Sequence, residues 1–171
     1  MNKWTLIDGY NVIQSWPELK ELSKVNLEHA RTELFEKMVE YGAFKGEKVV
    51  IIYDSTDVEG RSSIEEHKGI SVIYTAEKET ADSYIERLAH NLVKNGDEVF
   101  VVTSDYAEQI TIFVFGAYRI SSREFREKYL IAKKQIKEHA KKVKSSIGRN
   151  ELAGHLNGEV LAKFEVLRRK K

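Results

Sequence analysis

The sequence predicts an α/β fold in which helices cover both faces of a mostly parallel sheet. Its short apolar runs are rich in Val, Ile, Phe and Tyr, and they are continuous rather than alternating, as in strands buried on both faces. Segments with helical periodicity separate these runs, and strands that alternate with helices form right-handed βαβ units. The chain has 171 residues, 42% of them hydrophobic, which suits one domain with one core.

Four apolar runs are expected to form the parallel strands, because each has the length of a strand and ends in polar residues. They are residues 4–8, 48–54, 70–75 and 98–105. A shorter edge strand is expected at 118–121. The segment 105–117, "DYAEQITIFVFGA", fits either a helix that ends at Gly116 or another strand.

Helices are predicted where apolar residues recur at spacings of three and four. One such stripe runs through residues 26–41 and another through residues 80–94. A long helix is expected over about 122–145, with Ser121 or Ser122 as its N-cap. Together with the strands, these helices predict one compact α/β unit.

Charge is distributed unevenly, although the net charge is only +1. Residues 1–118 carry 12 Lys and Arg against 21 Asp and Glu, a net charge of −9, whereas residues 119–171 carry 16 against 6, a net charge of +10. A basic C-terminal third indicates a polyanionic partner, although a solvated helix face would give the same count. The expected division is a domain at 1–145 and a basic tail at 146–171, with a last helix at 158–169.

Composition excludes several classes of protein. The chain has no cysteine, so disulfides and thiolate metal sites are excluded. No apolar stretch is long enough for a signal peptide or for the ~18 residues of a membrane span. These observations predict a soluble, cytoplasmic protein.

Acidic residues lie at the ends of the predicted strands. Asp8, Asp54 and Asp105 each end an apolar run, and Asp82 opens the helix that follows the third run. Parallel strands place their carboxyl ends along one edge, where open α/β folds bind ligands, so these acids are expected to converge. Two carboxylates 4 Å apart repel by roughly 4 kcal/mol at an effective dielectric of ~20. Such a cluster predicts a hard cation, Mg²⁺ or Mn²⁺.

Each acid also has a structural explanation. Asp8 precedes a glycine, as in an ordinary turn, and Asp82 suits the positive end of a helix. Asp105 follows Ser104 in the manner of an N-cap, and Asp54 is the weakest candidate for a ligand. Local capping explains each acid alone but not their common edge, so the metal site stays the prediction.

The residues after the first strand are interpreted in the same way. Asn11 would orient a carboxylate or a metal-bound water, or else cap a turn. Gly9 would let the backbone bend tightly, and Tyr10 would stack on a base or pack. Trp16 is a second candidate for base stacking, whereas Trp4 is expected to belong to the core.

Four motifs are weak individually but fairly specific in combination. They are "DGYN" after the first strand, "ETAD" at a helix start, "TSD" after a later strand, and "GAYRISSREF". From about residue 4 to residue 130, the chain resembles the YacP-type group of the NYN-domain, PIN-like nucleases. The resemblance implies a three-layer α/β/α sandwich and a divalent-metal-dependent endoribonuclease. It also implies cleavage of mRNA in association with the ribosome.

The resemblance assigns site residues by position. The implied catalytic residues are Asp8, Asn11, Asp82 and Asp105, with the three aspartates as metal ligands and Asp54 as a further candidate ligand. Typical PIN domains also carry a glutamate, for which Glu79 and Glu86 are the candidates.

The resulting hypothesis is metal-assisted hydrolysis of an RNA phosphodiester. Basic and polar residues would hold the RNA, mostly through its phosphates, so that affinity falls as salt rises. The candidates are Tyr10, Ser104, Arg119, Arg123, Arg126, Lys133, Lys134, Lys137 and Lys141. The apolar positions of the long helix are expected to pack against the domain: Tyr129, Leu130, Ile136, Ala140 and Val143.

Other classes of function compete with this hypothesis. A non-catalytic RNA- or ribosome-binding module could share the fold, and a metal titration would separate the two. A phosphatase of the haloacid-dehalogenase type needs a second acid where this chain has Tyr10. In a receiver domain, Asp54 would be the aspartate that becomes phosphorylated. That class also needs paired acids at the first strand, where only Asp8 is present.

Overall fold

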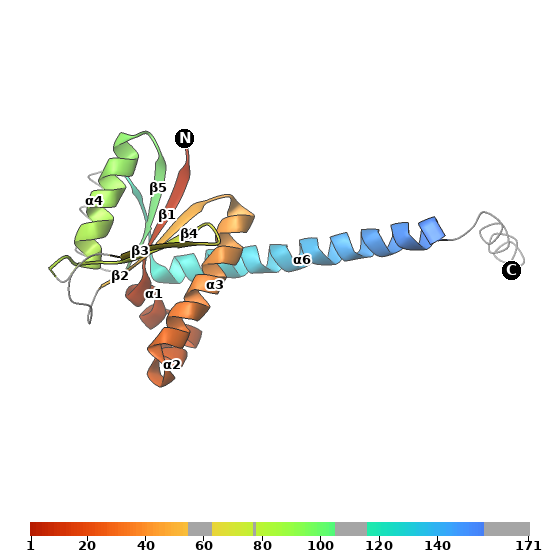
Figure 1. Cartoon of the computed structure of the whole chain (residues 1–171), viewed down its shortest axis with the longest axis horizontal. Helices are drawn as coiled ribbons and strands as arrows, with labels where there is room; N and C mark the ends of the chain where they lie inside the picture. Colours follow the sequence, from red (N-terminus) through yellow and green to blue (C-terminus); the bar gives the residue numbers. More distant parts are fainter. Residues whose placement is uncertain (55–62, 77, 105–115, 156–171) are drawn as a thin grey trace, which may run out of the picture. The chain divides into compact units, whose positions relative to one another are not determined.

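The computed structural model describes residues 1–54, 63–76, 78–104 and 116–155, with side chains up to Val143. The chain divides into two compact units, residues 1–133 and 134–171, and each is described by itself. The first unit contains a six-stranded sheet with helices on both faces, which confirms the predicted α/β sandwich (Figure 1). The predicted domain boundary at residue 145 stays a prediction.

The sheet has the strand order β3-β4-β2-β1-β5-β6. The strands are β1 (Lys3–Asp8), β2 (Lys48–Tyr53), β3 (Ser63–His67), β4 (Ile70–Tyr74), β5 (Glu98–Val102) and β6 (Tyr118–Ile120). All neighbouring strands are parallel except β3 and β4. The four predicted strands and the predicted edge strand are confirmed.

Strand β3 was not predicted, because "SIEEH" is mostly polar and lacks the apolar run of a buried strand. It lies at the sheet edge and pairs antiparallel with β4. The two residues between the strands, Lys68 and Gly69, have φ values of 50° and 77°. Positive φ at both positions is typical of the tight turns that join two strands in a hairpin. The hairpin therefore depends on turn geometry more than on hydrophobic pattern.

The helices are α1 (Gly9–Ser15), α2 (Pro17–Val25), α3 (Leu27–Lys45), α4 (Ala81–Lys94) and α6 (Ser122–His155). The stripes at 26–41 and 80–94 correctly predicted α3 and α4. Helices α1 and α2 were not predicted, because each is short and their apolar residues are few. Pro17 at the first position of α2 was an available signal, since proline is favoured there.

Strand side chains alternate between two apolar clusters. Ile7 and Ile51 belong to the cluster that contains residues of α1, α2, α3 and α6. Leu6, Val50 and Ile52 belong to the cluster under α4. Both faces of the central strands are therefore buried, which is why their sequences are continuous apolar runs.

Helix α6 begins with reciprocal capping bonds. The Ser121 hydroxyl accepts a hydrogen bond from Glu124 N–H at 3.2 Å, and the Glu124 carboxylate accepts one from Ser121 N–H at 2.8 Å. Ser121 is therefore the N-cap of the two candidates. The helix continues to His155, ten residues past the predicted end at about 145. The segments 105–115 and 158–169 lie outside the described residues.

Trp16 fixes the first turns of α6 within the first unit. Its ring is fully buried and stacks on Tyr129, with centroids 5.4 Å apart, and its Nε1–H donates to the Ser122 carbonyl at 2.9 Å. The prediction that Trp16 stacks on a base was therefore wrong. Tyr129 packs as expected, whereas Leu130 and Val143 are 42% and 54% exposed. None of the described helices is long and apolar enough to cross a membrane.

Candidate active site

The candidate site lies at the carboxyl edge of the sheet, where the strand order reverses. β1 pairs with β2 on one side and with β5 on the other. The chain proceeds from β1 outward to β2 and β4, then continues into β5 on the opposite side of β1. In doubly wound sheets the crevice at such a reversal is the usual ligand site. Asp8, the last residue of β1, lies at this point of the carboxyl edge.

Asp8 is a carboxylate in an environment that disfavours its charge. Its pKa is raised to about 6, mainly because burial penalises the charged form. A hydrogen bond from Asn11 N–H, 3.0 Å long, opposes this effect, while the charges of Asp82 and Asp54 add to it. Asp8 therefore lies close enough to Asp82 and Asp54 for their charges to interact, whereas the predicted convergence of Asp105 stays a prediction. Negative charge at Asp8 would be stabilised by a bound cation.

Asp54 has a structural role at the same edge. Its carboxylate accepts a hydrogen bond from Ala81 N–H at 2.5 Å, at the start of α4. Thr80 caps the same helix by accepting from Ser83 N–H at 3.2 Å. Asp54 thus ties the end of β2 to the helix turn that carries Asp82. Its suggested role as a metal ligand stays a prediction.

Asn11 connects three elements around the crevice. Its side-chain oxygen accepts hydrogen bonds from Ser104 N–H at 3.2 Å and from the Ser122 hydroxyl at 2.6 Å. Ser122 N–H in turn donates to the Ser104 hydroxyl at 3.3 Å. Asn11 therefore holds the residue that precedes Asp105 and the start of α6. The part played by Ser122 was missed, because no local pattern links it to a residue 111 positions away.

The candidate edge carries carboxylates, the type of side chain through which Mg²⁺ binds. Asp105 lies outside the described residues, and no three acidic or histidine side chains that the structure describes form a metal site by themselves. Mg²⁺ usually binds through one or two carboxylates and keeps several waters. A desolvated Asp8 beside Asp82 suits this mode of binding. Glu79, a candidate for the PIN-type glutamate, forms an ion pair with Arg87.

Gly9 is required for close packing. A Cβ atom at this position would lie 2.2 Å from Cε1 of Tyr53. Its φ is not in the left-handed region, so the expected tight bend is not the reason for this glycine. Tyr10 packs its ring on the same Tyr53, with centroids 5.0 Å apart. The approach of α1 to β2 therefore depends on the absence of a side chain at Gly9.

We expect Gly9→Ala to destabilise the protein by about 1–3 kcal/mol, because the added methyl group would displace the buried ring of Tyr53. Urea unfolding measures the change. Gln14→Ala is the control, since Gln14 is exposed on the same helix. If both variants unfold at the same urea concentration, the close contact does not determine the packing of α1.

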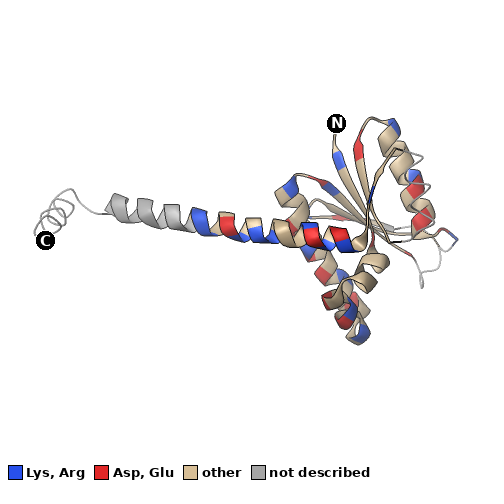
Figure 2. Cartoon of the chain, turned by 180° about the vertical axis from the view of Figure 1, so that it is seen from behind, with Lys and Arg blue, Asp and Glu red and all other residues tan. Residues whose placement is uncertain are grey.

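The basic residues among the predicted RNA contacts lie on β6 and α6 (Figure 2), whereas Tyr10 lies on α1 and Ser104 follows β5. In the first unit Arg119 and Arg123 are exposed and Lys133 is half-buried. Arg126 forms an ion pair with Glu18 of α2, with Nη2 and Oε2 3.0 Å apart, so it has a structural partner. In the second unit the exposed candidates are Lys134, Lys137 and Lys141. Contact of these residues with RNA stays a prediction.

Arg31 is a residue that the sequence analysis missed. Its guanidinium carbon lies 5.4, 5.6 and 5.8 Å from the ring centroids of Tyr10, Tyr53 and Tyr74. It also pairs with Glu28 at 2.8 Å and donates a hydrogen bond to the Tyr10 hydroxyl. The available signal was the position of Tyr53 and Tyr74 at equivalent ends of adjacent strands. The arginine that meets them comes from α3, whose register only the fold determines.

The fold and the site define the class of this protein: a PIN-like α/β sandwich with acidic residues at the carboxyl edge of a mostly parallel sheet. The chain belongs to the YacP-like NYN domain family, whose model matches residues 5–169. This result confirms the resemblance that the motifs indicated.

Similar proteins cover nearly the whole chain. The uncharacterized protein YacP of Bacillus subtilis (strain 168) is 39% identical over 164 residues, which are 96% of this chain and 95% of YacP. The crystal structure of Rae1 (YacP) from Bacillus subtilis matches with a TM-score of 0.73 at 38% identity, over 99% of this chain and 96% of that one. A mutant of the same protein matches with a TM-score of 0.72 at 37% identity, over 84% of each chain.

Proposed function

We propose that this protein is a divalent-metal-dependent endoribonuclease that cleaves mRNA in association with the ribosome. The main support is the environment of Asp8: a largely buried carboxylate at the reversal point of the sheet, under the negative charges of Asp82 and Asp54. A bound cation would favour the charged form of such a carboxylate, which burial and acidic neighbours disfavour. The family supports the nuclease class.

In the proposed mechanism, Asp8, Asp82 and Asp105 hold Mg²⁺ or Mn²⁺. When bound, the metal would supply a nucleophilic water at neutral pH and offset the charge of the phosphate. Asn11 positions the segment that leads into Asp105 through its bond to Ser104 N–H. The side-chain oxygen of Asn11 already accepts two hydrogen bonds, from Ser104 N–H and the Ser122 hydroxyl. The amide N–H₂ group of Asn11 can therefore donate to a phosphate or a water.

The basic C-terminal third supports RNA as the substrate. Exposed arginines on β6 and at the start of α6, and exposed lysines further along α6, would contact phosphates without reading bases. Ribosome association is proposed because exposed basic side chains also suit ribosomal RNA and because the YacP-type resemblance implies it. Binding of this kind weakens as the salt concentration rises.

The test is an RNA cleavage assay with the full-length protein and Mg²⁺ or Mn²⁺, using naked mRNA in one arm and translating ribosomes in the other. We expect cleavage by the wild type, and a loss of about 100-fold or more in Asp8→Asn and Asp82→Asn, because even outer-sphere partners of a metal contribute 10–100-fold. Asp97→Asn is the matched control. Asp97 lies at the amino edge of the same sheet, where it accepts a hydrogen bond from Asn2 N–H at 2.8 Å.

Each outcome has a clear reading. Cleavage only in the arm with translating ribosomes supports the full proposal. Cleavage in the arm with naked mRNA shows that the ribosome is not required. Undiminished cleavage in both site variants rejects the assigned site. RNA or ribosome binding without cleavage in any arm would identify a non-catalytic binding module instead.

A further inference from the structure

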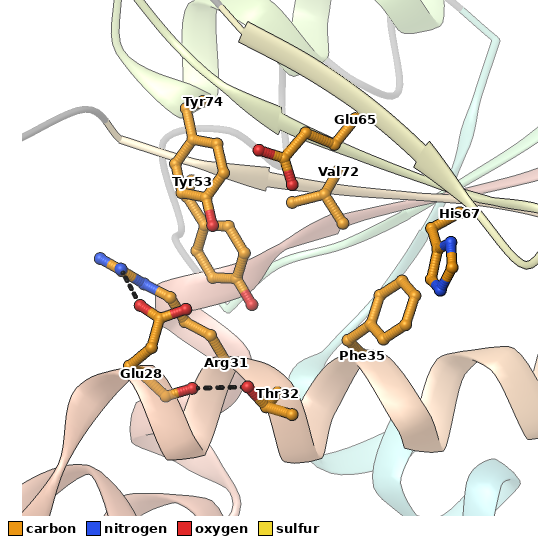
Figure 3. A pocket seen from close by; sticks show the side chains of 9 residues that line it. All are labelled: Glu28, Arg31, Thr32, Phe35, Tyr53, Glu65, His67, Val72 and Tyr74. Atoms are coloured by element: carbon orange, nitrogen blue, oxygen red, sulfur yellow. Dashed lines mark hydrogen bonds and ion pairs between the residues drawn. The ribbon is translucent and has the colours of Figure 1, made fainter. Parts of the chain in front are cut away.

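A pocket of about 230 Å³ lies between α3 and the strands β2, β3 and β4 (Figure 3). Aromatic side chains form much of its wall: Phe35 from α3, and Tyr53 and Tyr74, the last residues of β2 and β4. The two tyrosine rings are stacked, with centroids 5.5 Å apart and planes at 24°. Because these strands end at the same edge as Asp8, the tyrosine end of the pocket lies at the edge that carries the candidate active site. The pocket extends from there to His67, which pairs with Ile70 at the start of β4.

Two donors of residues that line this pocket have no partner within the described part of the chain. The Tyr53 hydroxyl is buried and has no hydrogen-bond partner among the described residues, and the same holds for Nε of Arg31. Burial also raises the pKa of Tyr53, so its hydroxyl stays protonated. Buried polar groups in native proteins nearly always have a partner. A ligand with acceptor atoms in the pocket would supply the missing partners.

Carboxylates complement these donors. Glu28 holds the Arg31 guanidinium through one oxygen at 2.8 Å, which fixes the arginine beside the tyrosine rings. Glu65 comes from the opposite wall, on β3, and its carboxylate points toward the side of the pocket formed by the tyrosines (Figure 3). The pocket thus combines flat aromatic walls with donors from α3 and β2 and an acceptor from β3.

We propose that this pocket binds a single nucleobase of the RNA and prefers guanine. The inference rests on the proposed function in taking RNA as the ligand. Unpaired bases are bound by stacking on aromatic side chains and by hydrogen bonds to their edges. Guanine offers the acceptors O6 and N7 to Arg31 and Tyr53, and its adjacent N1–H and N2–H₂ donors match the two oxygens of Glu65.

The size of the pocket agrees with this ligand. Sites for drug-sized molecules are roughly 300–1,000 Å³, and this pocket, at about 230 Å³, is smaller. One base would fill it while the sugar and phosphates stay outside. The guanine would then sit at a fixed offset from the phosphate at Asp8, so the pocket would select the cleavage position.

The test measures base preference without cleavage. Fluorescein-labelled 2′-O-methyl uridine hexamers with one central guanine, inosine, adenine or uridine are titrated with the full-length protein in EDTA, and anisotropy reports binding. We expect the guanine hexamer to bind about tenfold more tightly than the all-uridine one. Inosine, which lacks the N2 amino group, should lose most of this gain.

The variants are chosen to leave the fold intact. Glu65→Gln removes the carboxylate, and Tyr53→Phe removes only the unpaired hydroxyl. Each should reduce the guanine preference to roughly threefold or less. Glu66→Gln, the next residue of β3, points to the other face of the sheet and should keep the full preference.

Equal binding of all four hexamers, or an unchanged guanine preference in both pocket variants, overturns the proposal. A preference lost equally in Glu66→Gln would also overturn it. The outcome is separate from that of the cleavage assay, because EDTA removes the metal that the proposed cleavage requires. Guanine preference without cleavage of natural mRNA would reject the proposed nuclease activity and support the guanine pocket. Cleavage of mRNA without guanine preference would support the nuclease activity and reject the guanine pocket.

Discussion

Asp8→Asn is expected to reduce RNA cleavage strongly while making the metal-free protein more stable. Activity should fall about 100-fold or more, since the variant loses a charged ligand of the proposed ion. Stability should rise because the pKa of Asp8 is raised to about 6 from 3.8, so that folding disfavours the ionised carboxylate. Asparagine keeps an oxygen that can accept the hydrogen bond from Asn11 N–H, so the cap of α1 is retained.

The sign of the pH dependence follows from the direction of this shift. A carboxyl group with a raised pKa in the folded state binds protons more tightly when folded, so its contribution to stability is favourable at low pH and declines as pH rises. The decline should span about pH 4 to 6, between the unfolded and folded values. Above this range Asp8→Asn should exceed the wild type by up to about 3 kcal/mol, at 1.36 kcal/mol for each pKa unit.

Urea unfolding of both proteins in EDTA, from pH 4 to pH 8, measures this difference. Addition of Mn²⁺ should then stabilise the wild type, by about 2.7 kcal/mol at a hundred times its dissociation constant, and leave Asp8→Asn unchanged. A variant less stable than the wild type at pH 7 in EDTA would show that Asp8 is not held at a charge-disfavouring site. An equal Mn²⁺ response in both proteins would remove Asp8 from the metal site.

Asn11→Ala is expected to affect stability and cleavage together. The substitution leaves Ser104 N–H and the buried Ser122 hydroxyl without their acceptor, which should cost about 1–3 kcal/mol. Cleavage should fall about 10–100-fold, because the segment before Asp105 loses its anchor. Urea unfolding and the cleavage assay measure the two effects.

Two further variants separate these effects. Asn26→Ala removes the N-cap of α3, where Asn26 accepts from Glu28 N–H at 2.8 Å, and should cost about 1 kcal/mol without a loss of cleavage. In a double-mutant cycle, Asn11→Ala and Ser122→Ala should be non-additive, since they share one hydrogen bond. Additive stabilities, or full cleavage by Asn11→Ala, would contradict the anchoring role.

The motifs of the candidate site could be predicted from the sequence because they occupy equivalent places in a parallel sheet. A strand that ends on Asp8 and a helix that opens on Asp82 must meet at one edge once the strands are parallel. For Asp54, the sequence predicted its place at this edge but not its hydrogen bond to the start of α4. Its carboxylate binds Ala81 N–H, 27 residues away, and only the close approach of β2 and α4 makes that bond possible.

Aromatic residues show the limit of sequence reasoning most clearly. Tyr10 and Trp16 were both candidates for base stacking, and Trp16 is instead fully buried against Tyr129. Tyr10 is half-buried and packs one side on Tyr53, and its contact with RNA stays a prediction. The aromatic pocket beside α3 was not predicted at all. The residues next to Tyr10 and Trp16 in the sequence do not show whether these side chains are exposed or buried, because the groups that surround them come from distant segments of the chain.

The sequence by itself determined the α/β class, the parallel strands and the acidic edge, because the pattern of apolar residues and the ends of strands are local properties. The tertiary structure alone decided the Asn11–Ser104–Ser122 connection and the position of Arg31 beside three tyrosines. It also decided the close contact at Gly9. These features join residues far apart in the chain, and their hydrogen bonds and contacts exist only after the helices have packed on the sheet in one register.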